Sequence, residues 1–313
     1  MYHDTANNLP AGIGWLGTKT KTSDCCWSGR VSLLTYIEQS AAYDRLLSTI
    51  DSSSVTPPVV PYDTGIWGDP DVRLLLFGAL NCPSDPNIKQ LPTDAGLGSS
   101  GPTYCNYLFS CGDGMRNVNN PTSNINRRVL FGCACYHGFA FCSDGTSNTV
   151  AMSETSIAAE TDYPTTVKGG IIGANDETID TSSSARITNC LVHVDATKKN
   201  IETGYQARSL RGAFFYAAPD TTFINTVLPP NSPSCSVGAP ETNTCGSWGI
   251  FSAQSYHSGG VNVSMLDGSV RFVSDTINAE TAGSALSQKL DGESDFGIWG
   301  AMGTPNGGES VSP

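Results

Sequence analysis

Four histidines limit the acid–base chemistry that this sequence can support: His3, His137, His193 and His257. Nine residues separate His257 from Asp267, so the two could form the acid–base pair of a hydrolase, or His257 could be a ligand. The sequence contains no G-x-S-x-G elbow, no H-E-x-x-H pair and no phosphate-binding loop of the G-x-x-x-x-G-K type. A structural role, in which the His257 ring bonds a neighbouring carbonyl, is therefore favoured over a catalytic one.

Oxygen-bearing side chains gather in the segment 144–148, which reads D-G-T-S-N and precedes Glu154. Calcium binds about six to eight oxygens, and Asp144, Asn148 and Glu154 could supply several of them. The spacing differs from that of an EF-hand loop, and Asp and Asn also stabilise turns by bonding their own backbone. A tight turn around Gly145 is the favoured interpretation, and a calcium site is the alternative.

The eleven cysteines favour an extracytoplasmic, oxidising compartment, because none of them forms the C-x-x-C pair of a zinc ribbon or a thioredoxin-type site. If five bridges form, one thiol is left over. The close pairs Cys105 with Cys111 and Cys235 with Cys245 are candidates for local disulfide loops, each contributing about 2–3 kcal/mol.

Tryptophans in loop-like segments offer flat surfaces on which sugar rings could stack. Four of the five tryptophans fall in this class: Trp15, Trp67, Trp248 and Trp299. Core or loop packing is the favoured role for each of them. The alternative is an extracellular surface domain that binds a carbohydrate or another ligand through these rings.

The charge balance argues against a nucleic-acid partner. With 17 basic and 29 acidic residues the formal net charge is −12, and binding to phosphates depends on Lys and Arg. No span of the sequence suits a membrane either, because the longest apolar run, 74–80, is far shorter than the ~20 residues that a bilayer requires.

The elements that must position these side chains are those of a single α+β domain. Only 15% of the residues are charged, while 33 are glycine and 18 are proline, which favours short strands and long loops. Apolar residues at helical spacing predict one amphipathic helix over 31–50. Loops are expected at 51–61, 84–103 and 229–240, and 301–313 reads as a flexible tail.

Short strands are expected at 149–152, 170–172 and 213–216. A hairpin is expected at 261–273, where Asp267 and Gly268 suit a two-residue type I′ turn and Gly259 and Gly260 allow a sharp approach to the first strand. This turn pairs Met265 with Val270 and Val263 with Phe272. One buried face then carries Val261, Val263, Met265, Val270 and Phe272.

Six blocks of this sequence resemble, in order, a large bacterial family of prepilin-like proteins that carry a domain of unknown function. The segment 257–268 matches the family's H-x9-D-G motif without a gap. The other blocks are 2–12, 27–39, 82–86, 144–154 and 226–235. The resemblance covers roughly residues 2–293.

The resemblance implies a pilin-like globular domain over residues 1–300, in which an amphipathic helix packs on an antiparallel sheet with long disulfide-bearing loops. Similar proteins begin with a short basic leader and a G-F-T-L-I-E-type site that opens a long apolar helix, and the Tyr-His-Asp-Thr block follows that helix. Here the block begins at Tyr2, so we expect the leader and the membrane-embedded part of the helix to have been removed.

The function implied is that of a structural subunit of a type IV pilus or a type II secretion-like system, with no catalytic residue and no cofactor beyond the calcium alternative. Its partners would be other pilin-like subunits, bound through the missing helix. The motif residues Asp144, Gly145, Asn148, His257, Gly259, Gly260, Asp267 and Gly268 would then be scaffold features.

Overall fold

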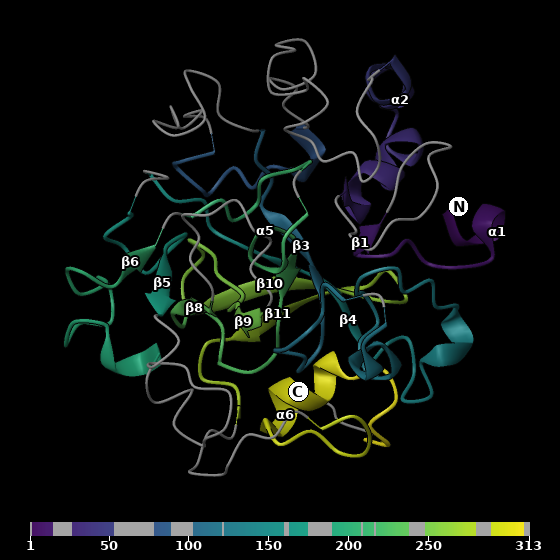
Figure 1. Ribbon diagram of the computed structural model, residues 1–313. Helices are drawn as coiled ribbons and strands as arrows, with labels where there is room; N and C mark the ends of the chain where they lie inside the picture. The colour runs from purple at the N-terminus through teal and green to yellow at the C-terminus, as the bar shows by residue number, and fades with distance from the viewer. Residues whose placement is uncertain are drawn as a thin grey trace.

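The computed structural model describes residues 2–14, 27–52, 78–88, 103–120, 122–159, 163–174, 190–207, 209–215, 217–237, 248–279 and 289–309. These residues form two principal sheets with short helices around them (Figure 1). The α-helices are α1 (Tyr2–Ala6), α2 (Ser40–Ser52), α5 (Pro219–Thr222) and α6 (Gly297–Gly303). The 3-10 helices are η1 (Gly29–Tyr36), η3 (Gly78–Leu80), η4 (Asn124–Arg127) and η5 (Phe139–Phe141).

The larger sheet has five strands in the order β11-β10-β4-β3-β7. They are β3 (Tyr107–Ser110), β4 (Val150–Glu154), β7 (Phe223–Ile224), β10 (Gly260–Met265) and β11 (Val270–Ser274). All neighbours are antiparallel except β3 and β7, which run parallel. The α+β class expected from the sequence is confirmed by this combination of antiparallel-rich sheets and few helices.

The two faces of this sheet differ at β10. Val261, Val263 and Met265 are buried, and they pack with Trp299 and Met302 of α6, which covers this face. The opposite face carries the intermediate side chains of Asn262 and Ser264. The alternation of apolar and polar residues along β10 therefore separates a core face from an open one.

The hairpin β10–β11 forms as predicted, but the predicted register is wrong. Val263 pairs with Arg271 and Asn262 pairs with Phe272, because the loop holds one more residue than a type I′ turn. Gly268, with φ of +86°, follows Asp267 in this loop. The shift by one residue turns Phe272 outward, where it is 53% exposed, and buries Val273 instead.

Val270 leaves the expected buried face for the same reason and is 70% exposed. The loop type decides this outcome: a left-handed glycine in third position is typical of a three-residue hairpin loop, and Asp-Gly occurs in both loop lengths. The two-residue turn predicted from the sequence is therefore wrong.

The single helix predicted over 31–50 is also wrong, because it is broken. The 3-10 helix η1 ends at Tyr36, Glu38 adopts φ of +62°, and α2 begins at Ser40. Val31 and Leu34, three residues apart, both point into the core, as 3-10 geometry allows. They pack with Leu46 of α2 and with Phe214 and Phe215.

Two of the remaining strand predictions are confirmed, since 149–152 overlaps β4 and 170–172 overlaps β5 (Ile171–Ala174). The strand expected at 213–216 is wrong over its described part, because Ala213 makes an isolated bridge to Tyr104 and a bend follows. The predicted loop 229–240 contains the strand β8 (Ser234–Val237).

The second sheet has the order β6-β5-β8-β9, with β6 at Gln206–Ala207 and β9 at Trp248–Ile250. Strands β5 and β8 run parallel, and the other pairs run antiparallel. The strands β1 (Ile13–Gly14) and β2 (Trp27–Ser28) form a separate two-stranded antiparallel pair, and Ile13 packs against Phe109 and Phe223 of the larger sheet.

The disulfide Cys190–Cys235 ties β8 to a segment 45 residues earlier in the sequence. Both predicted local loops are therefore wrong: Cys235 has a different partner from the one expected, and Cys105 and Cys111 are free and buried. Cys133 is also disulfide-bonded. Cys105 and Cys111 do not pair, since they belong to two different core clusters.

The C-terminal segment packs on the body as far as Glu309. Residues 301–303 belong to α6, Thr304 is buried, and Glu309 accepts hydrogen bonds from Ser294 and Thr304. The rest of the expected tail lies outside the described residues. Within the described part of the chain, no helix combines the length and the apolar character needed to cross a bilayer.

Candidate functional site

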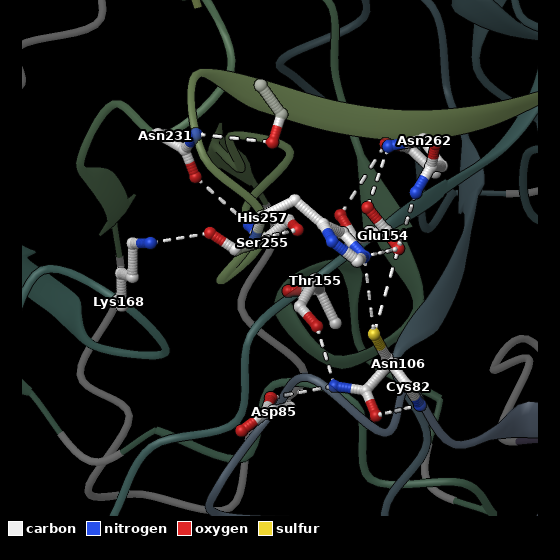
Figure 2. A network of polar contacts seen from close by, with 12 residues as sticks. Cys82, Asp85, Asn106, Glu154, Thr155, Lys168, Asn231, Ser255, His257 and Asn262 are labelled. Carbon is white, nitrogen blue, oxygen red and sulfur yellow. Dashed lines mark hydrogen bonds and ion pairs between the residues drawn. The ribbon is translucent and has the colours of Figure 1, made fainter. Parts of the chain in front are cut away.

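Three chemically different side chains meet at one end of the larger sheet. The Nε2 atom of His257 lies 3.2 Å from Oε1 of Glu154, and Sγ of Cys82 lies 3.7 Å from that nitrogen and 3.8 Å from that oxygen. Figure 2 shows the three side chains turned toward a common centre. Their segments are 72 and 103 residues apart in the sequence, so the fold alone brings them together.

Glu154 is positioned by the sheet itself. It is the last residue of β4 and pairs with Tyr107 at the start of β3. Its Oε2 accepts a hydrogen bond of 2.7 Å from the backbone N–H of Asn262, and its Oε1 accepts one of 3.2 Å from the Asn262 amide. Two donors from β10 therefore fix the plane of the carboxylate and leave Oε1 facing His257 and Cys82.

Cys82 is held by a network around Asn106. The Asn106 side chain accepts a bond from the Cys82 backbone N–H and donates to Asp85 and to the carbonyl of Thr155. Asp85 also accepts from the backbone of Ile157. Burial raises the pKa of Asp85, and these N–H donors oppose that shift.

His257 stands on a turn that two glycines shape. Its backbone N–H donates to the hydroxyl oxygen of Ser255. The backbone N–H of Ser255 in turn donates to the side chain of Asn231, and its carbonyl accepts from Lys168 (Figure 2). A Cβ on Gly260 would lie 2.1 Å from the carbonyl oxygen of Val273, so this position requires glycine. Gly259, with φ of +81°, precedes it. The glycine pair therefore turns the chain sharply from His257 into β10, as predicted.

The three groups differ in their access to solvent. The side chain of Glu154 is 3% exposed and Cys82 is 5% exposed, whereas the side chain of His257 is 34% exposed. A buried carboxylate requires a positive partner or several donors. The arrangement can form a His–Glu ion pair beside a thiol, or it can hold a metal ion with one sulfur, one nitrogen and one oxygen ligand.

Asp267 lies at the other end of β10 from His257. Six strand residues separate the two ends by about 20 Å at ~3.3 Å per residue, so the structure does not bring this pair together. Asp267 accepts hydrogen bonds from the backbone and hydroxyl of Ser269, and these bonds lower its pKa. It is a turn residue in this structure.

The D-G-T-S-N turn packs directly against that hairpin loop. The backbone N–H of Asp267 donates to the carbonyl of Thr146, and that of Leu266 donates to the carbonyl of Thr149. Within the turn, the Asn148 amide donates to the carbonyl of Asp144, with Gly145 at φ of +98°. The sequence blocks 144–154 and 257–268 therefore contact each other through backbone hydrogen bonds.

The proposed calcium ligands are not gathered in one place. Asp144 and Asn148 precede β4, and Glu154 ends it, with the length of the strand between them. The Asp144 carboxylate accepts bonds from the Gly308 N–H instead. This arrangement agrees with the turn interpretation, and Glu154 joins a different cluster.

Of the four candidate tryptophans, Trp248 and Trp299 are among the described residues. Trp299 of α6 is fully buried against the core face of the larger sheet, and its Nε1 donates to the carbonyl of Leu228. It therefore offers no surface to a sugar. Trp248 lies in β9. Trp15 and Trp67 lie outside the described residues.

A cleft of about 360 Å³ opens on the exposed face of the sheet, next to Glu154. Its walls are mainly apolar, with Glu154 and Asn262 as polar groups beside Leu80, Tyr107, Met152 and Val270. Burial and the nearby acidic groups raise the pKa of the Tyr107 phenol, which keeps it protonated. The cleft and the three-residue cluster therefore share Glu154.

In the sequence, His257 and Glu154 are candidates for separate roles, and nothing distinguishes Cys82 from the other ten cysteines. The positioning residues Asn106 and Asn262 carried no recognisable pattern. The three members of the cluster do fall in sequence blocks, since 82–86, 144–154 and 257–268 each supply one of them.

A comparison with family models matches residues 1–280 to a family described as a protein of unknown function (DUF1559). The chain belongs to this family. No curated protein matches the chain, and no solved structure matches it. Membership in DUF1559 thus supports the domain of unknown function that the resemblance named, and it assigns no activity.

Proposed function

We propose that this DUF1559 chain is the exported globular domain of a pilin- or pseudopilin-like structural subunit, belonging to a surface filament or a type II secretion-like apparatus. Its partners would be other subunits of the same kind, joined through an apolar stem helix. We assign no catalytic residue.

The observation that carries this proposal is the way in which the H-x9-D-G motif is used. His257 fixes one end of the β10–β11 hairpin to Glu154 and Cys82, and Asp267 fixes the other end to Thr146. A motif that secures both ends of a hairpin serves the scaffold, which is what a subunit that coats a filament needs.

The N-terminal helix offers a place for the stem. None of the residues of α1 is buried, and Figure 1 shows α1 at the edge of the molecule, away from both sheets. The Tyr2 ring meets Tyr36 edge-on at 5.3 Å, and the His3 ring stacks on Phe139 at 4.1 Å. A helix arriving from the N-terminal side could continue into α1 while these rings hold it to the body.

The disulfide Cys190–Cys235 supports an extracytoplasmic location, since such bonds persist in oxidising compartments.

The proposed function is tested on the gene and on its product. We expect the codons before Tyr2 to encode a basic leader, a cleavage site and an apolar helix, and the mature protein to appear in sheared filament fractions. A reading frame that starts at Met1 with no apolar segment upstream would refute the proposal.

A second candidate function is the binding of a small extracellular ligand, and the cleft beside Glu154 favours it. Its size suits a monosaccharide or a similar polar molecule, with Tyr107 as a stacking surface and Asn262 as a polar contact. Saturable retention on a polysaccharide array that Tyr107→Ala abolishes would support it. Retention that survives this substitution would exclude the cleft as the site.

A further inference from the structure

We infer that Cys82, Glu154 and His257 form a binding site for a divalent transition-metal ion of the zinc class. The site would have three protein ligands and a fourth position open to water. This inference goes beyond the structural function proposed above, and it would hold whether or not the domain belongs to a filament.

The distances between the three ligand atoms are those of a tetrahedral site. With metal–ligand bonds of about 2.0–2.3 Å, neighbouring ligand atoms of a tetrahedral zinc ion lie about 3.4–3.6 Å apart. The observed separations are 3.2 Å for nitrogen to oxygen, 3.7 Å for sulfur to nitrogen and 3.8 Å for sulfur to oxygen. Shifts of ~0.2 Å would therefore place all three atoms at bonding distance from one ion.

Groups behind the ligands orient them. Asn262 binds both carboxylate oxygens of Glu154, and Asn106 anchors the backbone of Cys82. Metal sites depend on such supporting contacts, which fix the direction of each ligand before the ion arrives. Asn106 is in turn held by Asp85, so the support extends to a third layer of buried polar groups.

The charges of the site balance when the ion is bound. A thiolate, a carboxylate and a neutral imidazole carry two negative charges, which one divalent ion cancels. This balance matters because Glu154 and Cys82 are both buried, and an uncompensated charge there is costly. Metal binding would release the thiol proton of Cys82 to solvent.

The ligand types select the class of metal. Calcium and magnesium prefer shells made of oxygen alone, whereas sulfur and imidazole nitrogen suit zinc and its neighbours in the first transition series. The partly exposed ring of His257 and the adjacent cleft give the ion access to the site. Once bound, the ion would join the loop 82–86, the end of β4 and the turn before β10.

The test is titration of the purified, metal-free protein with Co²⁺, followed by absorption spectroscopy. We expect one ion per chain, with a thiolate-to-cobalt charge-transfer band and the visible bands of a tetrahedral ion. Zn²⁺ should displace it and, at a hundredfold excess over Kd, raise the Tm by about 4 °C.

Matched variants make the result decisive. Cys82→Ser should remove the thiolate band, and the control Cys142→Ser, at another buried free thiol, should keep it. His257→Asn should weaken binding at least tenfold, while His193→Asn should not. Because His257 is partly exposed, this variant tests the site even if Cys82→Ser fails to fold.

Near-ultraviolet circular dichroism without metal confirms that each variant is folded. The inference is overturned if no thiolate band appears, if the band survives Cys82→Ser, or if Cys142→Ser removes it equally. It is also overturned if His257→Asn binds Co²⁺ as tightly as the parent protein, since the ion would then be held without His257.

Discussion

The register of the β10–β11 hairpin buries one valine of β11 and exposes another, so substituting each in turn tests it. Val273 is 2% exposed and pairs with Val261, whereas Val270, on the same strand, is 70% exposed. Val273→Ala removes two buried methyl groups, which costs about 1.6 kcal/mol in transfer free energy and about 2 kcal/mol with the cavity included. Val270→Ala should change the free energy of unfolding by less than about 0.5 kcal/mol.

The assay is thermal unfolding of the two variants beside the parent protein. For a chain of 313 residues, a loss of about 2 kcal/mol lowers the Tm by about 3 °C, which is readily measured. The two-residue turn expected from the sequence would reverse the ranking, because it buries Val270. A larger loss of Tm for Val270→Ala than for Val273→Ala would therefore refute the observed register.

Three further predictions concern groups away from the site. Asp113→Asn should lower the free energy of unfolding by about 3–5 kcal/mol, because it removes the carboxylate that accepts two hydrogen bonds from the buried guanidinium of Arg128. Equilibrium unfolding measures this loss, and a loss below about 1 kcal/mol would contradict the prediction. Burial lowers the pKa of His137, so the unfolded chain takes up the proton first and the free energy of unfolding falls as the pH drops below about 6.5. The Tm measured from pH 7.5 to 5.5 should therefore decline less in His137→Gln than in the parent protein. Equal slopes of Tm against pH in the two proteins would contradict this prediction. Cys235→Ser opens a loop of 45 residues and should cost about 4 kcal/mol on the chain-entropy estimate, as measured by the Tm under non-reducing conditions, with an unchanged Tm as the contrary result.

The sequence was sufficient to predict the elements that local pattern determines. The alternation of apolar and polar residues in 260–265 marks β10, and Asp-Gly marks the turn after it. The register was not predictable, because hairpin loops of two residues and of three residues both use the Asp-Gly dipeptide. The helix break at Glu38 has a similar origin, since 3-10 and α-helical segments both suit the same apolar spacing.

The site could be predicted only in part. His257 attracted attention because histidine is scarce, and Glu154 because it follows an acidic turn. Their meeting with Cys82 depends on the pairing of β4 with β3 and β10, which no local pattern specifies. The same non-local pairing explains why Asp144 and Asn148, near Glu154 in sequence, lie at the far end of the strand.

The distances around His257 also limit what the H-x9-D-G motif can do. A spacing of nine residues suggested a catalytic pair, but an extended strand carries its two ends apart rather than together. The motif instead marks the two points at which one hairpin is attached to β4 and its flanking turns.

The central claim is that three distant blocks converge on one metal centre, and X-ray absorption at the zinc edge of the zinc-loaded protein tests it most directly. We predict a four-coordinate shell with one sulfur at about 2.3 Å and the remaining nitrogen and oxygen ligands at about 2.0–2.2 Å. A shell of nitrogen and oxygen alone, with no sulfur scatterer, would contradict the claim.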